Sequence, residues 1–279
     1  MRRIDMKKTF LFILICVLSI GFLLVHHLYI KGGNPGSAHD MEMVLRPATA
    51  EESWDVFMSS RPLYNITVKK HVYPVDYFLP SDDNCFKEIF TQENVADDYI
   101  AECREKFINQ IYDEKELHRF DNMLETVIIP KLKQSIDEFL VPLLPSWNTK
   151  LPSKLEIITR YGYGGEYWMD EDGIAYLHFK MLQYPNDEEK IFSLFFHEFV
   201  HILIEKPIIQ KYNVPQDLKE RIVDLICYEF IKRPFNERFE DSFANAYITP
   251  EVIKTDLPGA VKKMMSDYKA FQQKQAQEK

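Results

Sequence analysis

Apolar residues recur at intervals of three and four along two stretches of the chain, which is the spacing of one face of a helix. These stretches run from Cys85 to Tyr112 and from Glu114 to Leu144. Pro130 lies inside the second stretch, and we expect it to kink or break that helix because proline has no N–H to donate. The pattern therefore predicts that residues 51–150 are mainly helical.

After a cluster of prolines, apolar and polar residues alternate along the chain instead of recurring at helical spacing. Residues 154–161 alternate as a half-buried strand does, and residues 166–169 and 174–179 flank the turn sequence 170–173 as the two arms of a hairpin. Helical patterns then return, bounded by prolines and an acidic capping residue. The predicted helices run from residue 187 to about 205, from 216 to 232 and from 239 to 247. Residues 51–279 are thus predicted to form an α+β body, with its strands and last helices in residues 151–279.

The first thirty residues have the pattern of a membrane or export segment. Residues 1–9 are rich in Arg and Lys, and residues 10–30 are almost entirely apolar. We predict a cytoplasmic basic tail, a transmembrane anchor and a body outside the cytoplasm. The alternative is a signal cleaved near residues 36–38, which would release a secreted protein. Turn-forming residues over 31–50 predict a linker between this segment and the body.

Composition and charge narrow the classes of function. The chain of 279 residues carries 34 Lys and Arg against 43 Asp and Glu, and this net charge of −9 excludes a broad basic surface for nucleic acid. Its four cysteines form no Cys-x-x-Cys pair, so a metal site would have to use His, Asp and Glu. An oxidising location would allow a disulfide between Cys85 and Cys103 and would leave Cys227 buried and reduced.

The strongest chemical signal is the sequence His197-Glu198-Phe-Val-His201. On a helix the two imidazoles project from one face, one turn apart, and can share a zinc ion, while Glu198 lies beside them as a general base for a metal-bound water. The flanking residues are nearly all apolar, and three buried polar groups would cost several kcal/mol without a partner. The alternative is a core helix whose histidines bond to the backbone.

A catalytic zinc needs a third protein ligand and one open position. Glu220 and Asp224 lie four positions apart on the next predicted helix, where two negative charges repel each other. Such a pair is best tolerated where a cation, or histidines bound to a cation, lies between the two carboxylates. A solvated face is the alternative, because Lys219 and Arg221 adjoin Glu220 in sequence.

These two helices resemble the gluzincin branch of zinc metallopeptidases, in which a glutamate follows HExxH by about eighteen residues and an aspartate lies four positions beyond it. Eighteen residues separate His201 from Glu220 here. The resemblance covers about thirty residues. It implies a zincin-like fold in which His197, His201 and Glu220 hold one zinc ion, Glu198 is the general base, and Asp224 orients His197.

A rival third ligand lies further along the chain. Residues 235–247 loosely resemble the helix of lethal-factor-like zinc peptidases, and that alignment offers Glu240 or Asp241 in place of Glu220. The predicted strand 173–180 precedes the HExxH sequence, as does the antiparallel edge strand that binds an extended substrate in zincins, so it is a candidate for that strand. The alternative is an ordinary core strand. Three residues are candidate oxyanion donors, with Tyr247 placed first: Tyr247, Tyr228 and His178.

Taken together, the sequence predicts a membrane-anchored or secreted, zinc-dependent hydrolase of peptide bonds, which acts on a peptide or protein substrate. Two other hypotheses keep the same residues. One is a tethered binding or scaffold protein with a structural or inactive zinc site, and the other is a metal-dependent hydrolase of non-peptide amides or esters. Substitution of Glu198 by Gln separates catalysis from scaffolding, because only an enzyme needs that carboxylate.

Overall fold

A computed structural model describes most of the chain between residues 36 and 277. Its described ranges are 36–59, 84–92, 94–161, 165–180, 187–232 and 242–277. The predicted membrane segment and the rival ligands Glu240 and Asp241 lie outside these ranges. Within the ranges, no helix has both the length and the apolar character needed to cross a bilayer.

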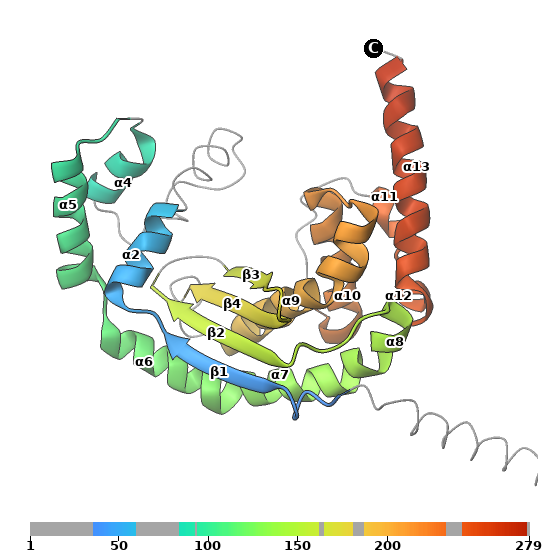
Figure 1. Cartoon of the computed structure of the whole chain (residues 1–279), viewed down its shortest axis with the longest axis horizontal. Coiled ribbons are helices and arrows are strands. Elements are labelled where there is room, and N and C mark those ends of the chain that lie inside the picture. Colours follow the sequence, from blue (N-terminus) through green and yellow to red (C-terminus); the bar gives the residue numbers. More distant parts are fainter. Residues whose placement is uncertain are drawn as a thin grey trace, which may run out of the picture.

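One small mixed sheet forms the centre of the molecule (Figure 1). Its strands are β1 (Glu42–Pro47), β2 (Lys154–Arg160), β3 (Gly165–Met169) and β4 (Ile174–Lys180). The order is β1-β2-β4-β3, in which β1, β2 and β4 are parallel and β3 runs antiparallel to β4. An α+β fold with an antiparallel edge strand is therefore confirmed.

One prediction about the sheet is wrong, and one open alternative is decided. Part of the expected linker 31–50 is strand β1, which pairs with β2 from Glu42 to Pro47. Its short apolar centre gives no alternation to recognise, and its pairing partner lies more than a hundred residues away. The segment 173–180 is not an edge strand, because β4 lies between β2 and β3. The short strand β3 forms the edge instead, because it pairs only with β4 among the described strands.

A separate group of helices packs around aromatic rings at one end of the sheet. It contains α2 (Ala50–Ser59), α4 (Asn84–Thr91) and α5 (Asp97–Lys106), followed by a π-helical turn at Phe107–Ile111. A disulfide joins Cys85 to Cys103, as predicted. We refer to the buried rings between these helices as the aromatic cluster: Trp54, Phe57, Phe86, Phe90 and Phe107.

A long curved helical run passes beneath the sheet. It consists of α6 (Glu114–Met123), α7 (Ile129–Ser135) and α8 (Leu144–Trp147), joined by π-helical and 3-10 turns. Pro130 does not break it, because Pro130 lies at the start of α7, directly after the π-helical turn Leu124–Ile128. The wider π turn gives the proline ring room against the preceding turn, where an α-helix would clash.

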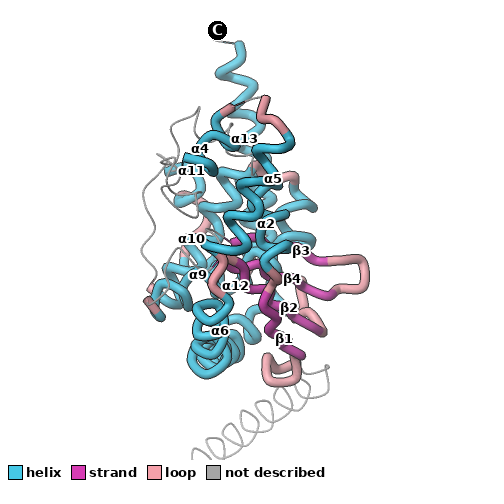
Figure 2. The backbone as a smooth tube through the Cα atoms, turned by 90° about the vertical axis from the view of Figure 1, so that its left-hand side faces the viewer, coloured by secondary structure: helices cyan, strands magenta, loops and turns pink. Residues whose placement is uncertain are grey.

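The remaining helices lie on the same side of the strands as α6 (Figure 2). They are α9 (Glu188–Ile204), α10 (Gln216–Ile231), α11 (Ser242–Asn245), α12 (Pro250–Thr255) and α13 (Leu257–Gln277). Only residues 242–245 of the helix predicted over 239–247 are helical within the described chain. The main core is continuous through α7, α9, α10 and the inner face of the sheet. Cys227 is buried there as a free thiol, as predicted.

Candidate metal centre

Helix α9 carries the HExxH sequence through the middle of the core. Asp187 caps its first turn by accepting a hydrogen bond from the Lys190 amide at 3.1 Å, and two glutamates follow in that turn, where negative charge is favourable. Apolar side chains on several faces of α9 pack against the sheet and the neighbouring helices, so the helix is largely buried. His197 and His201 are 7% and 1% exposed, so both imidazoles have lost almost all contact with water.

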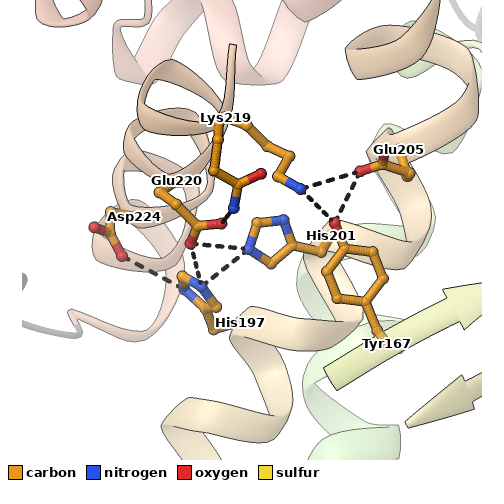
Figure 3. Close-up of polar contacts among 8 residues, drawn as sticks. Tyr167, His197, His201, Glu205, Lys219, Glu220 and Asp224 are labelled. Atoms are coloured by element: carbon orange, nitrogen blue, oxygen red, sulfur yellow. Dashed lines mark hydrogen bonds and ion pairs between the residues drawn. The ribbon is translucent and has the colours of Figure 1, made fainter. Parts of the chain in front are cut away.

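Three ligand atoms from α9 and α10 converge at one point (Figure 3). The Nε2 atoms of His197 and His201 are 3.1 Å apart. Oε2 of Glu220 lies 3.4 Å from Nε2 of His197 and 3.3 Å from Nε2 of His201. The structure thus brings together the three residues that the sequence predicts as ligands.

The spacing of these atoms fits a small tetrahedral cation. Zinc binds nitrogen and oxygen at about 2.0–2.1 Å, so two ligand atoms at a tetrahedral angle are separated by about 3.3 Å. All three observed separations lie within about 0.2 Å of that value. Two imidazoles and one carboxylate also match the donor set of catalytic zinc sites with three protein ligands. The residues present therefore fit a divalent metal ion of this kind.

The charges around the site favour a cation at this point. Burial disfavours the charged form of His197, yet contacts with Asp224, Cys227 and Glu220 raise its pKa well above the ordinary value. Burial opposes ionisation of Glu220 too, but contacts with His197 and His201 lower the pKa of this carboxyl strongly. In the metal-free protein the site thus attracts a proton, and a divalent ion would compete with that proton for the same atoms.

Two residues of α10 support the ligands. Oδ1 of Asp224 lies 3.4 Å from Nδ1 of His197, where a carboxylate can orient the ring, as predicted. Gln216 donates from Nε2 to Oε1 of Glu220 at 2.7 Å, which leaves Oε2 facing the histidines. The sequence analysis did not identify Gln216, although its position four residues before Glu220 places it on the same helix face.

Glu198 lies at the site but not among the three converging ligands. It is 9% exposed. Its negative charge contributes to the raised pKa of Tyr167, which places the carboxylate in the electrostatic surroundings of that ring. Because Glu198 is not one of those ligands, its carboxylate remains available for the general-base role that the HExxH sequence predicts.

A second polar cluster, missed by the sequence analysis, adjoins His201. The Tyr167 ring on β3 is parallel to the His201 ring, with centroids 4.8 Å apart and planes 10° apart. Its hydroxyl donates to Oε2 of Glu205 at 2.8 Å and accepts from Nζ of Lys219 at 3.0 Å. Glu205 lies four residues after His201, and Lys219 lies directly before Glu220. This closeness to the predicted ligands is the only feature of the sequence that could have pointed to the cluster.

The predicted oxyanion donors make other contacts. The Tyr247 hydroxyl donates to Asp267 of α13 at 2.8 Å, and Tyr228 is half exposed, with Lys232 over its ring. Nε2 of His178 lies 3.0 Å from a guanidinium nitrogen of Arg160. Within the described ranges, none of the three belongs to the group of converging ligand atoms.

The comparisons with known proteins add no relative to this description. No family model matches the chain, and no curated protein or solved structure matches it either.

Proposed function

We propose that the protein is a zinc-dependent peptidase whose body lies outside the cytoplasm, tethered by its N-terminal segment. The observation that supports this most is the convergence of two Nε2 atoms and one carboxylate oxygen at separations of 3.1–3.4 Å, on helices that also carry the glutamate of the HExxH sequence. This convergence agrees with what the resemblance to the gluzincin peptidases, over the same two helices, implies.

The proposed mechanism assigns one role to each residue. His197, His201 and Glu220 hold the ion. When bound, the ion supplies a Lewis acid that polarises a carbonyl and acidifies water. Glu198 accepts a proton from the attacking water and delivers it to the leaving amine, so one carboxylate serves as base and then as acid. Asp224 holds His197 in the orientation that points Nε2 towards the other ligands.

The edge strand β3 is the proposed substrate-binding element. It packs against α9, and Tyr167 from this strand stacks on His201, so the edge lies beside the ligand group. In the described chain, only one side of β3 is paired, and the other side is available for an extended peptide. Main-chain hydrogen bonds along such an edge bind a peptide with little dependence on its sequence.

The decisive test is Glu198→Gln in the full chain. The substitution keeps the shape of the side chain and removes its basicity, so we expect peptide cleavage to fall by about 10²–10⁴-fold. Zinc content, measured by elemental analysis, should stay near one ion per chain, because Glu198 is not a ligand. A mixed peptide library with and without chelator gives the activity measurement.

The matched control is Glu189→Gln on the same helix. Glu189 is exposed in the first turn and pairs with Lys131 away from the ligands, so cleavage and zinc content should both stay unchanged. Full activity in Glu198→Gln would contradict the proposed mechanism. Zinc binding without any cleavage by the unsubstituted protein would favour the scaffold hypothesis.

A further inference from the structure

The two ligand histidines are supported in different ways. Nδ1 of His197 faces the carboxylate of Asp224 at 3.4 Å. Nδ1 of His201 is buried too, and within the described ranges neither Nδ1 atom makes a hydrogen bond, so the ion pair with Asp224 is what distinguishes His197. Ligand histidines usually donate their second N–H to a carboxylate, carbonyl or water, and this bond fixes the ring plane. The orientation of His201 therefore needs another explanation.

The explanation is a stacked phenol ring. Tyr167 lies parallel to His201 at a centroid distance of 4.8 Å, within the range of favourable ring pairs. Contact between the two parallel, offset rings opposes rotation of the imidazole about the bond that joins it to Cβ. Such a rotation would carry Nε2 away from Oε2 of Glu220, which is 3.3 Å from it in the structure.

Tyr167 is itself held in place by charged groups. Its hydroxyl bonds to Glu205 and to Lys219, and the Lys219 ammonium lies 3.7 Å from the Glu205 carboxylate. These three side chains come from β3, from the turn that follows α9 and from α10 (Figure 3). The Lys219 side chain is only 13% exposed, so solvent competes little for its bonds.

We propose that Tyr167 is a positioning residue for the metal site: its ring fixes the plane of His201, and Lys219 and Glu205 fix Tyr167. The proposal rests on metal binding by His197, His201 and Glu220. Through Tyr167, the edge strand is coupled to the metal: a displacement of β3 changes the support of one ligand.

The test measures metal binding instead of catalysis. Metal-free full-length protein is titrated with Zn²⁺ against a competing chelator and, separately, with Co²⁺, whose visible spectrum reports the geometry of its ligands. Tyr167→Leu removes the ring, and we expect zinc affinity to fall by about 10-fold or more, as for loss of other groups that orient ligands. The Co²⁺ spectrum should change as well. Tyr167→Phe keeps the ring and loses only the hydroxyl contacts, so affinity should fall by about threefold, much less than in Tyr167→Leu, with the original spectrum.

Tyr176→Leu is the matched control. Tyr176 lies on the neighbouring strand, where it stacks on Trp168 rather than on a ligand, so its loss should leave zinc affinity and spectrum unchanged. Lys219→Met, which keeps both rings, is a second variant in case Tyr167→Leu does not fold. It should weaken zinc binding by about threefold, because it loosens Tyr167 without removing it.

The outcomes separate this proposal from the proposed function. Unsubstituted protein that binds no metal would overturn the metal site itself. If the unsubstituted protein binds zinc, and Tyr167→Leu has the same zinc affinity and the same Co²⁺ spectrum, the positioning role is overturned. An equal loss in Tyr167→Leu and Tyr176→Leu would also overturn it, because that result indicates general damage to the sheet. Should Tyr167→Leu not fold, unchanged affinity in Lys219→Met decides against the proposal.

Discussion

The metal-site region and the aromatic cluster are held together in opposite ways. Around α9 and α10, polar atoms from His197, His201 and Glu220 converge at the edge of an apolar core, an arrangement that could hold a cation. Around α2, α4 and α5, aromatic rings pack on one another, and the Cys85–Cys103 disulfide links two of the helices. One region contains a group of residues that could hold a cation, and the other contains a covalent bond that forms under oxidising conditions.

This difference indicates that the two regions can be perturbed separately. The two buried clusters are distinct, and partly buried Tyr112 and Tyr161 pack against both. Rings of these tyrosines lie 6.0 Å apart, and the Tyr112 hydroxyl donates to the carbonyl of Ala48. Chelation should therefore act on the metal site and reduction on the aromatic cluster, with these tyrosines as the contact between them.

The largest effect is expected from Phe86→Ala. Phe86 is fully buried, and its ring lies 5.7–6.5 Å from those of Phe57, Phe107 and Trp54. Its removal leaves a cavity and should lower the free energy of unfolding by about 3–5 kcal/mol, measured by chemical denaturation. Zinc affinity should not change. A clear loss of zinc affinity in Phe86→Ala would show that the two regions form one cooperative unit. The control is Tyr228→Ala, because Tyr228 is half exposed and its removal should change the free energy of unfolding by less than about 0.5 kcal/mol.

Reduction of the disulfide should have a somewhat smaller effect. Cys85 and Cys103 are 18 positions apart, and a loop of that size is expected to contribute about 3 kcal/mol by restricting the unfolded chain. Thermal unfolding with and without reductant measures the change. Protein with Cys227→Ser serves as the control and should respond to reductant as the unsubstituted chain does. No response in either protein would contradict the contribution of the bridge.

A smaller effect is expected from pH in the metal-free protein. The pKa of His197 is raised, so its stabilising contribution is complete below the unfolded value of about 6.5 and is lost as pH rises through the folded value. The pKa of Glu220 is lowered, so its contribution is present above about 4.3 and is lost only in stronger acid. Solvent screening limits both effects, because the Glu220 side chain is 41% exposed.

Stability of the chelated protein should therefore fall as the pH rises above about 6.5, whereas zinc affinity should rise, because zinc binds the neutral imidazole. Denaturation at a series of pH values measures the first trend, and titration with a competing chelator measures the second. Asp224→Asn should flatten the first trend by removing one group that raises the pKa of His197. A chelated protein whose stability rises above pH 7 would contradict the assignment.

The parts of the site that follow helical spacing could be predicted from the sequence. His197 and His201 are one turn apart, and Glu220 and Asp224 repeat that spacing on the next helix, so local geometry determines which face each pair shares. The convergence of these two faces followed from the resemblance, and the structure brings them together. The disulfide could be proposed because only two cysteines lay in the predicted exported helical part.

Contacts between distant segments could not be predicted in this way. Strand β1 is short, and only its pairing with β2 makes it a strand. Tyr167 meets His201 because the hairpin places β3 against α9, and no periodic pattern encodes that contact. The passage of Pro130 through a continuous helical run depends on a π turn, which has no sequence signature comparable with a cap or a heptad.

The three tryptophans occupy three different surroundings. Trp54 lies in the aromatic cluster, Trp147 is fully buried in the main core and donates to the carbonyl of Ile253, and Trp168 is partly exposed on β3. Indole emission depends on the polarity around the ring. Variants that each retain a single tryptophan would therefore carry built-in optical probes for the disulfide-linked helices, the central body and the proposed substrate edge, without any attached dye.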